Sequence, residues 1–212
     1  MTAYVCLLLE SEDKIMNGYY NYKNGTQSIY GLQPNFEKDL FKNAITDRLI
    51  ADENTKLHGA EIGVLNGETS AFFLNEFPML TLIGIDPIIP DSMEASLIGN
   101  TQIIEQNVGS NKDRWEFYMD YSFKVHQNFQ DETFDFIFID GDHTYEAVAQ
   151  DFELYLPKVK KGGLVFMHDS RMNRGGANFH TGSSRFADKT IAYDGRVSLI
   201  GEAFSLTCFI KK

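Results

Sequence analysis

One stretch, Phe134–Asp169, constrains what this chain can fold into more than any other part of the sequence. It opens with Phe134–Ile139, in which Asp135 is the one polar residue, a pattern typical of a strand buried on both faces of a parallel sheet. The apolar positions within Thr144–Leu156 recur at three- and four-residue steps, as they do along one face of a helix. A second apolar run, Leu164–Met167, follows. We therefore predict a strand, a helix and a parallel strand joined by a right-handed crossover.

Both predicted strands end in polar residues that carry chemistry. These acids and histidines are Asp140, Asp142 and His143 after the first strand, and His168 and Asp169 after the second. Ligands of open α/β sheets bind at the carboxyl ends of the strands, and parallel strands bring these ends to one edge. We therefore predict a functional site at this edge. The plainer alternative is that the acids cap the helices that follow, and Asp142 is the residue that this alternative suits best.

The net charge and the cysteines limit the partners and the location of the protein. A formal charge of −11 disfavours a nucleic-acid backbone and an anionic membrane surface as partners, and leaves small molecules open. Cys6 and Cys208 lie too far apart for a metal-binding spacing, and no apolar run reaches the length of a membrane span. We expect a cytoplasmic protein that acts on a small molecule.

The length of the chain, 212 residues, suits one α/β domain with a substantial core. We expect a single domain over residues 1–212. Residues 1–34, rich in tyrosine towards their end, are expected to form an N-terminal arm or lid, which is also compatible with a homodimer. Residues 170–190, rich in glycine and arginine, are expected to form an insertion loop over the edge of the sheet that carries the site.

Seven strands are expected in all. The first runs to Glu61 or Ile62, and the others are Leu80–Ile85, Trp115–Met119, Phe134–Ile139, Leu164–Met167, Ile191–Ile200 and Phe204–Ile210. We expect Lys161–Gly163 to turn the chain ahead of the fifth strand, and Gly201–Glu202 to turn it between the last two. These closing strands would form the antiparallel C-terminal edge of the sheet. The predicted fold class is α/β: a doubly wound, Rossmann-like, mostly parallel seven-stranded sheet with helices on both faces.

A glycine-rich turn follows the first strand, in the segment Glu61-Ile-Gly-Val-Leu-Asn-Gly-Glu-Thr-Ser70. Such a strand-to-helix turn usually lets a ligand approach backbone amides at the start of a helix. The dinucleotide fingerprint, G-x-G-x-x-G, is absent from it, and so is the lysine-bearing phosphate loop. The span from Glu61 to Asp86 fits a strand, a turn, a helix and a return strand, so we expect both acids at the same edge of the sheet.

This turn resembles the first motif of class I S-adenosylmethionine-dependent methyltransferases, and the resemblance extends over about Leu57–Asp169. It implies S-adenosyl-L-methionine as the cofactor. It also implies that Asp86 binds the ribose hydroxyls and that Asp120, with Tyr121 and Ser122, contacts the adenine. The cofactor-binding residues that it implies are Glu61, Gly63, Asn66, Gly67, Ser70, Asp86, Asp120, Tyr121, Ser122 and Asp140.

The segments Asp-Gly-Asp-His-x-Tyr and Gly-Gly-x-x-x-x-His-Asp resemble the methyltransferase family 24 group, whose relatives are small-molecule O-methyltransferases. In metal-dependent relatives a divalent cation is held after the fourth and fifth strands. By position, this implies Asp140, His168 and Asp169 as ligands of Mg²⁺ or another divalent cation. Those relatives mostly have an acid where this chain has His168, and imidazole suits Zn, Fe, Ni and Cu better than Mg. Ligation by His168 and a neutral imidazole that orients Asp169 both remain open.

The resemblance implies O-methylation of a small hydroxylated molecule, such as a sugar, an antibiotic-like compound or a phenol. The base of such enzymes lies three residues after the first acid, which assigns His143 and Asp140 to catalysis. An imidazole with an ordinary pKa of about 6.5 suits the removal of a proton near neutral pH. Two other functions stay in view: a catalytically silent module that binds the cofactor, and a metal-dependent hydrolase. The hydrolase would leave Glu61 and Asp86 without a role.

Overall fold

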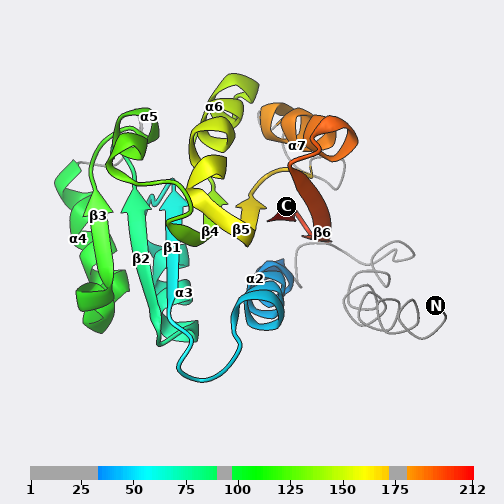
Figure 1. The fold of residues 1–212 in the computed structure, drawn as a ribbon. Coiled ribbons are helices and arrows are strands. Elements are labelled where there is room, and N and C mark those ends of the chain that lie inside the picture. Colours follow the sequence, from blue (N-terminus) through cyan, green and yellow to red (C-terminus); the bar gives the residue numbers. More distant parts are fainter. Residues whose placement is uncertain (1–32, 90–96, 172–180) are drawn as a thin grey trace.

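The computed structural model of the protein describes residues 33–89, 97–171 and 181–212. Its strands are β1 Leu57–Ile62, β2 Leu80–Ile85, β3 Trp115–Tyr118, β4 Phe134–Ile139, β5 Val159–Met167, β6 Val197–Ala203 and β7 Leu206–Lys211. They form one sheet in the order β3-β2-β1-β4-β5-β7-β6 (Figure 1). Neighbours from β3 to β5 pair in parallel, whereas β7 is antiparallel to both β5 and β6. The predicted seven-stranded, mostly parallel sheet is confirmed.

Six α-helices of the described part cover the sheet, three on each face. On one face lie α2 Gln33–Leu49, α3 Glu68–Glu76 and α4 Leu97–Val108, and on the other α5 Ser122–Val125, α6 Tyr145–Tyr155 and α7 Thr181–Tyr193. Short 3₁₀ segments occupy Gly109–Arg114, His126–Asn128 and Leu156–Lys158. Each face has its own buried apolar cluster, to which all three helices of that face contribute. The expected helices on both faces are thus confirmed.

Phe41 on α2 shows how the first face is packed. Its ring centroid lies 4.8 Å from that of Phe73 on α3, 4.8 Å from that of Phe166 on β5 and 5.1 Å from that of Phe138 on β4. The three contacts are edge-to-face, and all four side chains are buried. Such pairs contribute about 0.5–1.5 kcal/mol each beyond the burial of their area. The phenylalanines of the strand pattern therefore join two helices to the middle of the sheet.

The fifth strand begins earlier than the sequence pattern indicates. β5 starts at Val159, so Lys161–Gly163, expected as a turn ahead of the strand, lies inside it. Gly162 has a φ of 78°, and the pairing of β4 with β5 shifts register across this segment. A Cβ on Gly163 would lie 2.7 Å from the carbonyl oxygen of Asp135. The two glycines form a bulge that lets the strand continue, and their composition alone reads as a turn.

The expectation of an insertion loop at 170–190 is wrong for its second half. Residues 181–190 belong to α7, while 172–180 lie outside the described residues. Phe186 and Ala187 of α7 are buried against the same cluster as Phe152 of α6. Because most helical stability in proteins comes from such packing, a helix can form where composition favours a loop. The glycine and serines at the start of α7 interrupt the helical repeat of apolar residues, so the helix was not recognised from the sequence.

The closing hairpin is shifted along the chain. Ile191–Tyr193, expected as the start of a strand, end α7, and β6 begins only at Val197. The turn falls at Phe204–Ser205, with Phe204 at a φ of 50°, and Gly201–Glu202 lie within β6. The pairing of β6 with β7 shifts register just before Gly201, so this glycine marks a bulge and not the turn.

The predicted arm at 1–34 lies outside the described residues except for its last two, which begin α2. Among the helices of the described ranges, none combines the length and the apolar character that a bilayer crossing requires.

Candidate active site

The strand-end acids meet at one edge of the sheet. The backbone amide of Asp140 donates to Ile62 in β1, at 2.8 Å, and that of His168 donates to Ile139 in β4, at 3.0 Å. The amide of Asp86 donates to Tyr118 in β3, at 3.1 Å. These bonds continue the parallel ladders by one step, so each residue stands just beyond the carboxyl end of its own strand. This is the edge at which ligands bind in open α/β sheets.

The glycine turn is folded so that only glycine fits its first bend. Gly63 has a φ of 89°, and a Cβ there would lie 2.1 Å from the carbonyl oxygen of Asp140. Gly67, with a φ of 75°, stands immediately before α3. Between them, the carbonyl oxygen of Asn66 accepts from the side-chain amide of Asn107, at 2.8 Å. Through Gly63, the turn packs directly against the backbone of Asp140 at the end of β4.

Asp86 holds the same turn from the neighbouring strand. Its Oδ2 accepts from the amides of Val64, at 2.8 Å, and Leu65, at 2.9 Å, and its Oδ1 accepts from the amide of Ile88, at 2.7 Å. Three amide donors fix this carboxylate beside the glycine turn. The structure therefore places Asp86 where the sequence predicted it, in contact with the turn.

Glu61 lies beneath the turn, with 1% of its surface exposed. Its Oε2 accepts a short hydrogen bond from the hydroxyl of Ser70 on α3. The pKa of Glu61 is raised to about 8, mainly by burial and with a smaller contribution from the carboxylates of Asp140 and Asp86, against the effect of the Ser70 hydrogen bond. Glu61 and Ser70 together join β1 to the first turn of α3.

Asp120, Tyr121 and Ser122 follow β3, at the far side of β2 from the glycine turn. Asp120 accepts from the amide of Tyr121, at 2.8 Å, and from Nζ of Lys124, at 2.9 Å. The hydroxyl of Ser122 donates to Asp151 on α6. None of the contacts described for these three residues reaches the acids and histidines after β4 and β5.

Asp151 is a buried acid that the sequence reading missed. It lies on the apolar face of α6, and burial raises its pKa to about 6 against the hydrogen bond from Ser122. Tyr155, one turn further along, donates its hydroxyl to the carbonyl oxygen of Ser122, at 3.0 Å. The signal that could have found Asp151 is an acid at an apolar position of a helix pattern.

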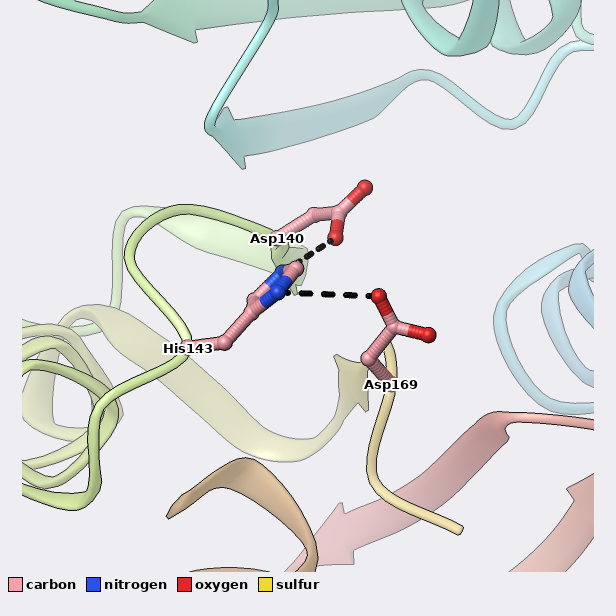
Figure 2. A group of neighbouring side chains, drawn as sticks. All are labelled: Asp140, His143 and Asp169. Carbon is pink, nitrogen blue, oxygen red and sulfur yellow. Dashed lines mark hydrogen bonds and ion pairs between the residues drawn. The ribbon is translucent and has the colours of Figure 1, made fainter. Parts of the chain in front are cut away.

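His143 stands between Asp140 and Asp169 (Figure 2). Its Nε2 lies 3.3 Å from Oδ1 of Asp140, and its Nδ1 lies 3.6 Å from Oδ2 of Asp169. The hydrogen bond with Asp140 raises the pKa of His143 above its ordinary value, although burial acts in the opposite direction. Asp169 has a φ of 46°, in the left-handed region that aspartate enters more readily than most non-glycine residues. The two strand ends and the loop after β4 converge on this imidazole.

His168 links this cluster to a second pair of residues. Its Nδ1 lies 3.0 Å from Oδ1 of Asp140 and 3.5 Å from Oδ2 of Asp169. Its Nε2 lies 3.3 Å from Oε2 of Glu37 and 3.3 Å from the hydroxyl of Ser205. Burial lowers the pKa of His168, but the carboxylates of Asp140, Asp169 and Glu37 outweigh it and hold this pKa well above its ordinary value.

Glu37 and Ser205 were not predicted as site residues. Glu37 lies in the first turns of α2 and accepts from both the amide and the hydroxyl of Ser205, in the turn between β6 and β7. They are 168 positions apart in the chain. The sequence offers no local signal for this pair, because the contact exists only once the first described helix and the last hairpin meet at His168.

A divalent cation fits part of this cluster. Asp140, His143 and Asp169 each offer a ligand atom within 4.8 Å of the others, and His168 turns Nδ1 towards the same two carboxylates. Mg²⁺ favours six oxygen ligands, whereas imidazole nitrogen beside carboxylate oxygen suits first-row ions such as Zn²⁺ or Fe²⁺. The donors present therefore fit a metal that accepts nitrogen better than they fit Mg²⁺.

Comparison with known proteins gives one family and one fold. Residues 60–170, more than half of the chain, match the methyltransferase family 24 model, described as a methyltransferase domain. The uncharacterized protein R132 of Acanthamoeba polyphaga mimivirus is 34% identical over 119 residues, which cover 55% of this chain and 53% of that protein. The chain thus spans about half the length of the curated relative that it matches.

Two solved structures share the fold over almost the whole chain. A candidate caffeoyl-CoA O-methyltransferase from Staphylococcus aureus has a TM-score of 0.61 and 17% identity, with 99% of this chain and 98% of that chain covered. The O-methyltransferase TomG of tomaymycin synthesis in Streptomyces achromogenes, solved in complex with SAM, has a TM-score of 0.61 and 13% identity, with 96% and 90% covered. The family model matches residues 60–170, the segment that contains the glycine turn and the strand-end acids. The chain therefore belongs to methyltransferase family 24.

Proposed function

We propose that this protein transfers a methyl group from S-adenosylmethionine to a hydroxyl oxygen of a small molecule. The observation that carries the proposal is the position of His143, held between Asp169 and Asp140, whose backbone packs against Gly63 of the glycine turn. A base and a cofactor turn that follow neighbouring strands at one edge of the sheet can bring an acceptor hydroxyl and a methyl group together. Holding two reactants in line supplies up to roughly 7–11 kcal/mol of the barrier in favourable cases.

The cofactor would lie along the carboxyl ends of β1, β2 and β3. Asp86 is the acid proposed for the ribose hydroxyls, and its hydrogen bonds from the amides of Val64 and Leu65, which hold it beside the glycine turn, support this proposal. Asp120, Tyr121 and Ser122 are proposed for the adenine end. The remaining proposed cofactor residues are Glu61, Gly63, Asn66, Gly67, Ser70 and Asp140. Glu61 would support the cofactor site indirectly, because its hydrogen bond with Ser70 joins β1 to α3 on either side of the glycine turn.

In the reaction, the oxygen of the acceptor forms a bond to the methyl carbon as the bond from that carbon to sulfur breaks. The hydroxyl proton passes to His143, and the cofactor leaves as S-adenosylhomocysteine. Asp140 and Asp169 orient the imidazole and stabilise its protonated form through the contacts at 3.3 and 3.6 Å. Catalysis by a positioned base of this kind contributes typically 10²–10⁴-fold.

We also propose which residues would hold a divalent cation. Asp140, Asp169 and Nδ1 of His168 face one another, and Glu37 accepts from the opposite nitrogen of the same imidazole. A carboxylate on the far nitrogen is the usual partner of a metal-bound histidine, because it fixes the tautomer. A bound cation would make the acceptor hydroxyl more acidic. His143 is then left as the base.

Thermal unfolding with S-adenosylhomocysteine tests the cofactor, on wild type, Asp86→Ala and the control Asp113→Ala, an exposed acid in the 3₁₀ segment before β3. At a hundredfold excess over Kd, linkage predicts about 2.7 kcal/mol of stabilisation of the wild type. We expect the same for Asp113→Ala and a smaller gain for Asp86→Ala, which loses the carboxylate beside the ribose.

The same experiment separates the alternatives. No stabilisation of wild type by S-adenosylhomocysteine, with or without EDTA or added Mg²⁺ or Zn²⁺, would overturn the proposal in favour of a metal-dependent hydrolase. Stabilisation by Zn²⁺ that Asp169→Ala abolishes would support the proposed metal ligands. A turnover of methyl groups, sought with a panel of sugars and phenols, separates an enzyme from a silent cofactor-binding module.

A further inference from the structure

We propose that the first turn of α7 positions His143, with Gly182 and Ser183 as positioning residues. This inference rests on the proposed function, because it concerns the residue assigned as the base. The observations that carry it are contacts between α7 and the backbone of the loop after β4. They concern neither the cofactor nor a metal.

Gly182 is pressed against the loop backbone. A Cβ on Gly182 would lie 2.3 Å from the carbonyl oxygen of His143, 2.3 Å from the amide nitrogen of Tyr145 and 2.6 Å from the carbonyl carbon of Thr144. All three are backbone atoms, so none of them can rotate away as a flexible side chain would. Glycine is costly inside a helix relative to alanine. The close approach to His143–Tyr145 is the physical reason for a glycine here.

Ser183 makes the contact directional. Its amide donates to the carbonyl oxygen of His143, at 3.1 Å, and its hydroxyl donates to the same oxygen, at 3.4 Å. The first amides of a helix have no acceptor within that helix. The carbonyl of His143 therefore serves as the acceptor for the start of α7, and α7 in turn fixes the peptide plane that follows the His143 side chain.

The residue at the other end of this segment, Tyr145, is held by the same helix. Its ring centroid lies 5.6 Å from that of Phe186, at 70°, and its hydroxyl accepts from Nζ of Lys189, at 2.9 Å. The guanidinium of Arg185 lies over the same ring, at 5.5 Å. Helix α7 thus contacts His143 in the loop and Tyr145 at the start of α6. These two contacts restrict movement of the loop relative to α7.

These contacts fix the backbone position from which the His143 side chain extends. His143 reaches Asp140 at 3.3 Å and Asp169 at 3.6 Å from a backbone that α7 holds. A general base must lie within hydrogen-bond reach of the proton that it removes. A mutation distant from the reacting atoms that misplaces a catalytic group by about 1 Å can lower the rate about 10²-fold. A shift of α7 would therefore move His143 while the glycine turn kept its own contacts.

The test compares Gly182→Ala with Gly195→Ala, a control in the turn just after α7, where an added Cβ meets nothing within 4 Å. Two readouts need no methyl acceptor: hydrogen exchange of the Ser183 amide, and the imidazole resonance of His143 at one fixed pH with EDTA present. We expect a protected Ser183 amide in wild type and in Gly195→Ala. In Gly182→Ala we expect loss of that protection and a shifted His143 resonance, with the resonances of His58 and His126 unmoved.

A second variant, Phe186→Leu, keeps the test decisive if Gly182→Ala does not fold. It loosens α7 on Tyr145 without touching the loop backbone, and we expect the same two changes at smaller size. An unprotected Ser183 amide in wild type, or a His143 resonance unmoved in both folded variants, would overturn the inference. S-adenosylhomocysteine should stabilise the wild type and Gly182→Ala equally. Failure to stabilise wild type would instead count against the proposed function.

Discussion

Glu61 holds a proton near neutral pH because its carboxyl group is buried below the glycine turn. Its pKa of about 8 lies above the ordinary value of 4.5. Between these values the folded protein binds a proton that the unfolded chain has released, so this group lowers the stability of the fold as the pH rises through that window. The loss is on the order of 1.4 kcal/mol per pH unit and levels off above the folded pKa.

Glu61→Gln removes this dependence, since the amide stays neutral and can still accept from Ser70. We expect the free energy of unfolding of Glu61→Gln, relative to wild type, to rise between about pH 5 and about pH 8, as measured by urea unfolding. The exposed glutamate Glu105 on α4 supplies the control, Glu105→Gln, whose difference from wild type should stay flat. A difference for Glu61→Gln that stays constant or reverses across this range would contradict the buried, protonated carboxyl.

Single residues also show where the sequence stops being informative. Asp140, His143 and Asp169 could be found because each follows a recognisable strand, and the topology brings strand ends together. Glu37 and Ser205 could not, because each owes its role to an element that only tertiary packing brings near. Asp151 did leave a signal, an acid at an apolar position of a helix pattern, which the reading missed. Whether the residues assigned to cofactor and metal fulfil these roles remains a prediction.

At the scale of elements, the glycine turn is the part whose geometry is least tolerant. Gly63→Ala meets two costs: a left-handed φ of 89° and a Cβ placed 2.1 Å from the backbone of Asp140. Gly109→Ala is a matched control, since Gly109 has a φ of 56° but an added Cβ there meets nothing within 4 Å. We expect urea unfolding to show a loss of about 1–2 kcal/mol for the control and clearly more for Gly63→Ala.

We also expect Gly63→Ala to lose its stabilisation by S-adenosylhomocysteine, and Gly109→Ala to keep it. Equal losses of stability in the two variants would show that the contact with Asp140 relaxes without cost, and that the turn is less rigid than its geometry indicates.

The elements differ in how far their sequence determines them. Leu80–Ile85 and Phe134–Ile139 were predicted residue for residue, because a parallel strand buried over most of its length has a nearly continuous apolar run, which only Thr81 and Gly84 interrupt in the first and Asp135 in the second. Helix α7 was read as a loop because its stability comes from α6 and from the loop at His143. The bulges at Gly162–Gly163 and at Gly201 were read as turns, because glycine marks both and only the pairing of the strands tells them apart.

At the scale of the whole molecule, Phe41 joins α2 to the middle of the sheet. Phe41→Ala would remove a side chain that is 4% exposed and that contacts three other buried rings. We expect a loss of about 3–5 kcal/mol in the free energy of unfolding. Phe123→Ala is the control, since that ring is 43% exposed, and should change stability by less than about 1 kcal/mol.

The result has a second use, because α2 also carries Glu37. If Phe41→Ala proves as mild as Phe123→Ala, α2 is held less firmly than its ring contacts indicate, and the hydrogen bond of Glu37 with His168 would have to be sustained from the side of Ser205.

The hydrogen bonds between Glu37 and Ser205 make the site depend on residues outside the segment that identifies the family. The segment that identifies the family, residues 60–170, contains the glycine turn, Asp140, His143 and Asp169, yet both partners of Nε2 of His168 lie outside it. A fragment cut to that segment, or a chimera that grafts it onto another domain, would keep every recognisable motif and still leave one nitrogen of His168 without its native acceptors.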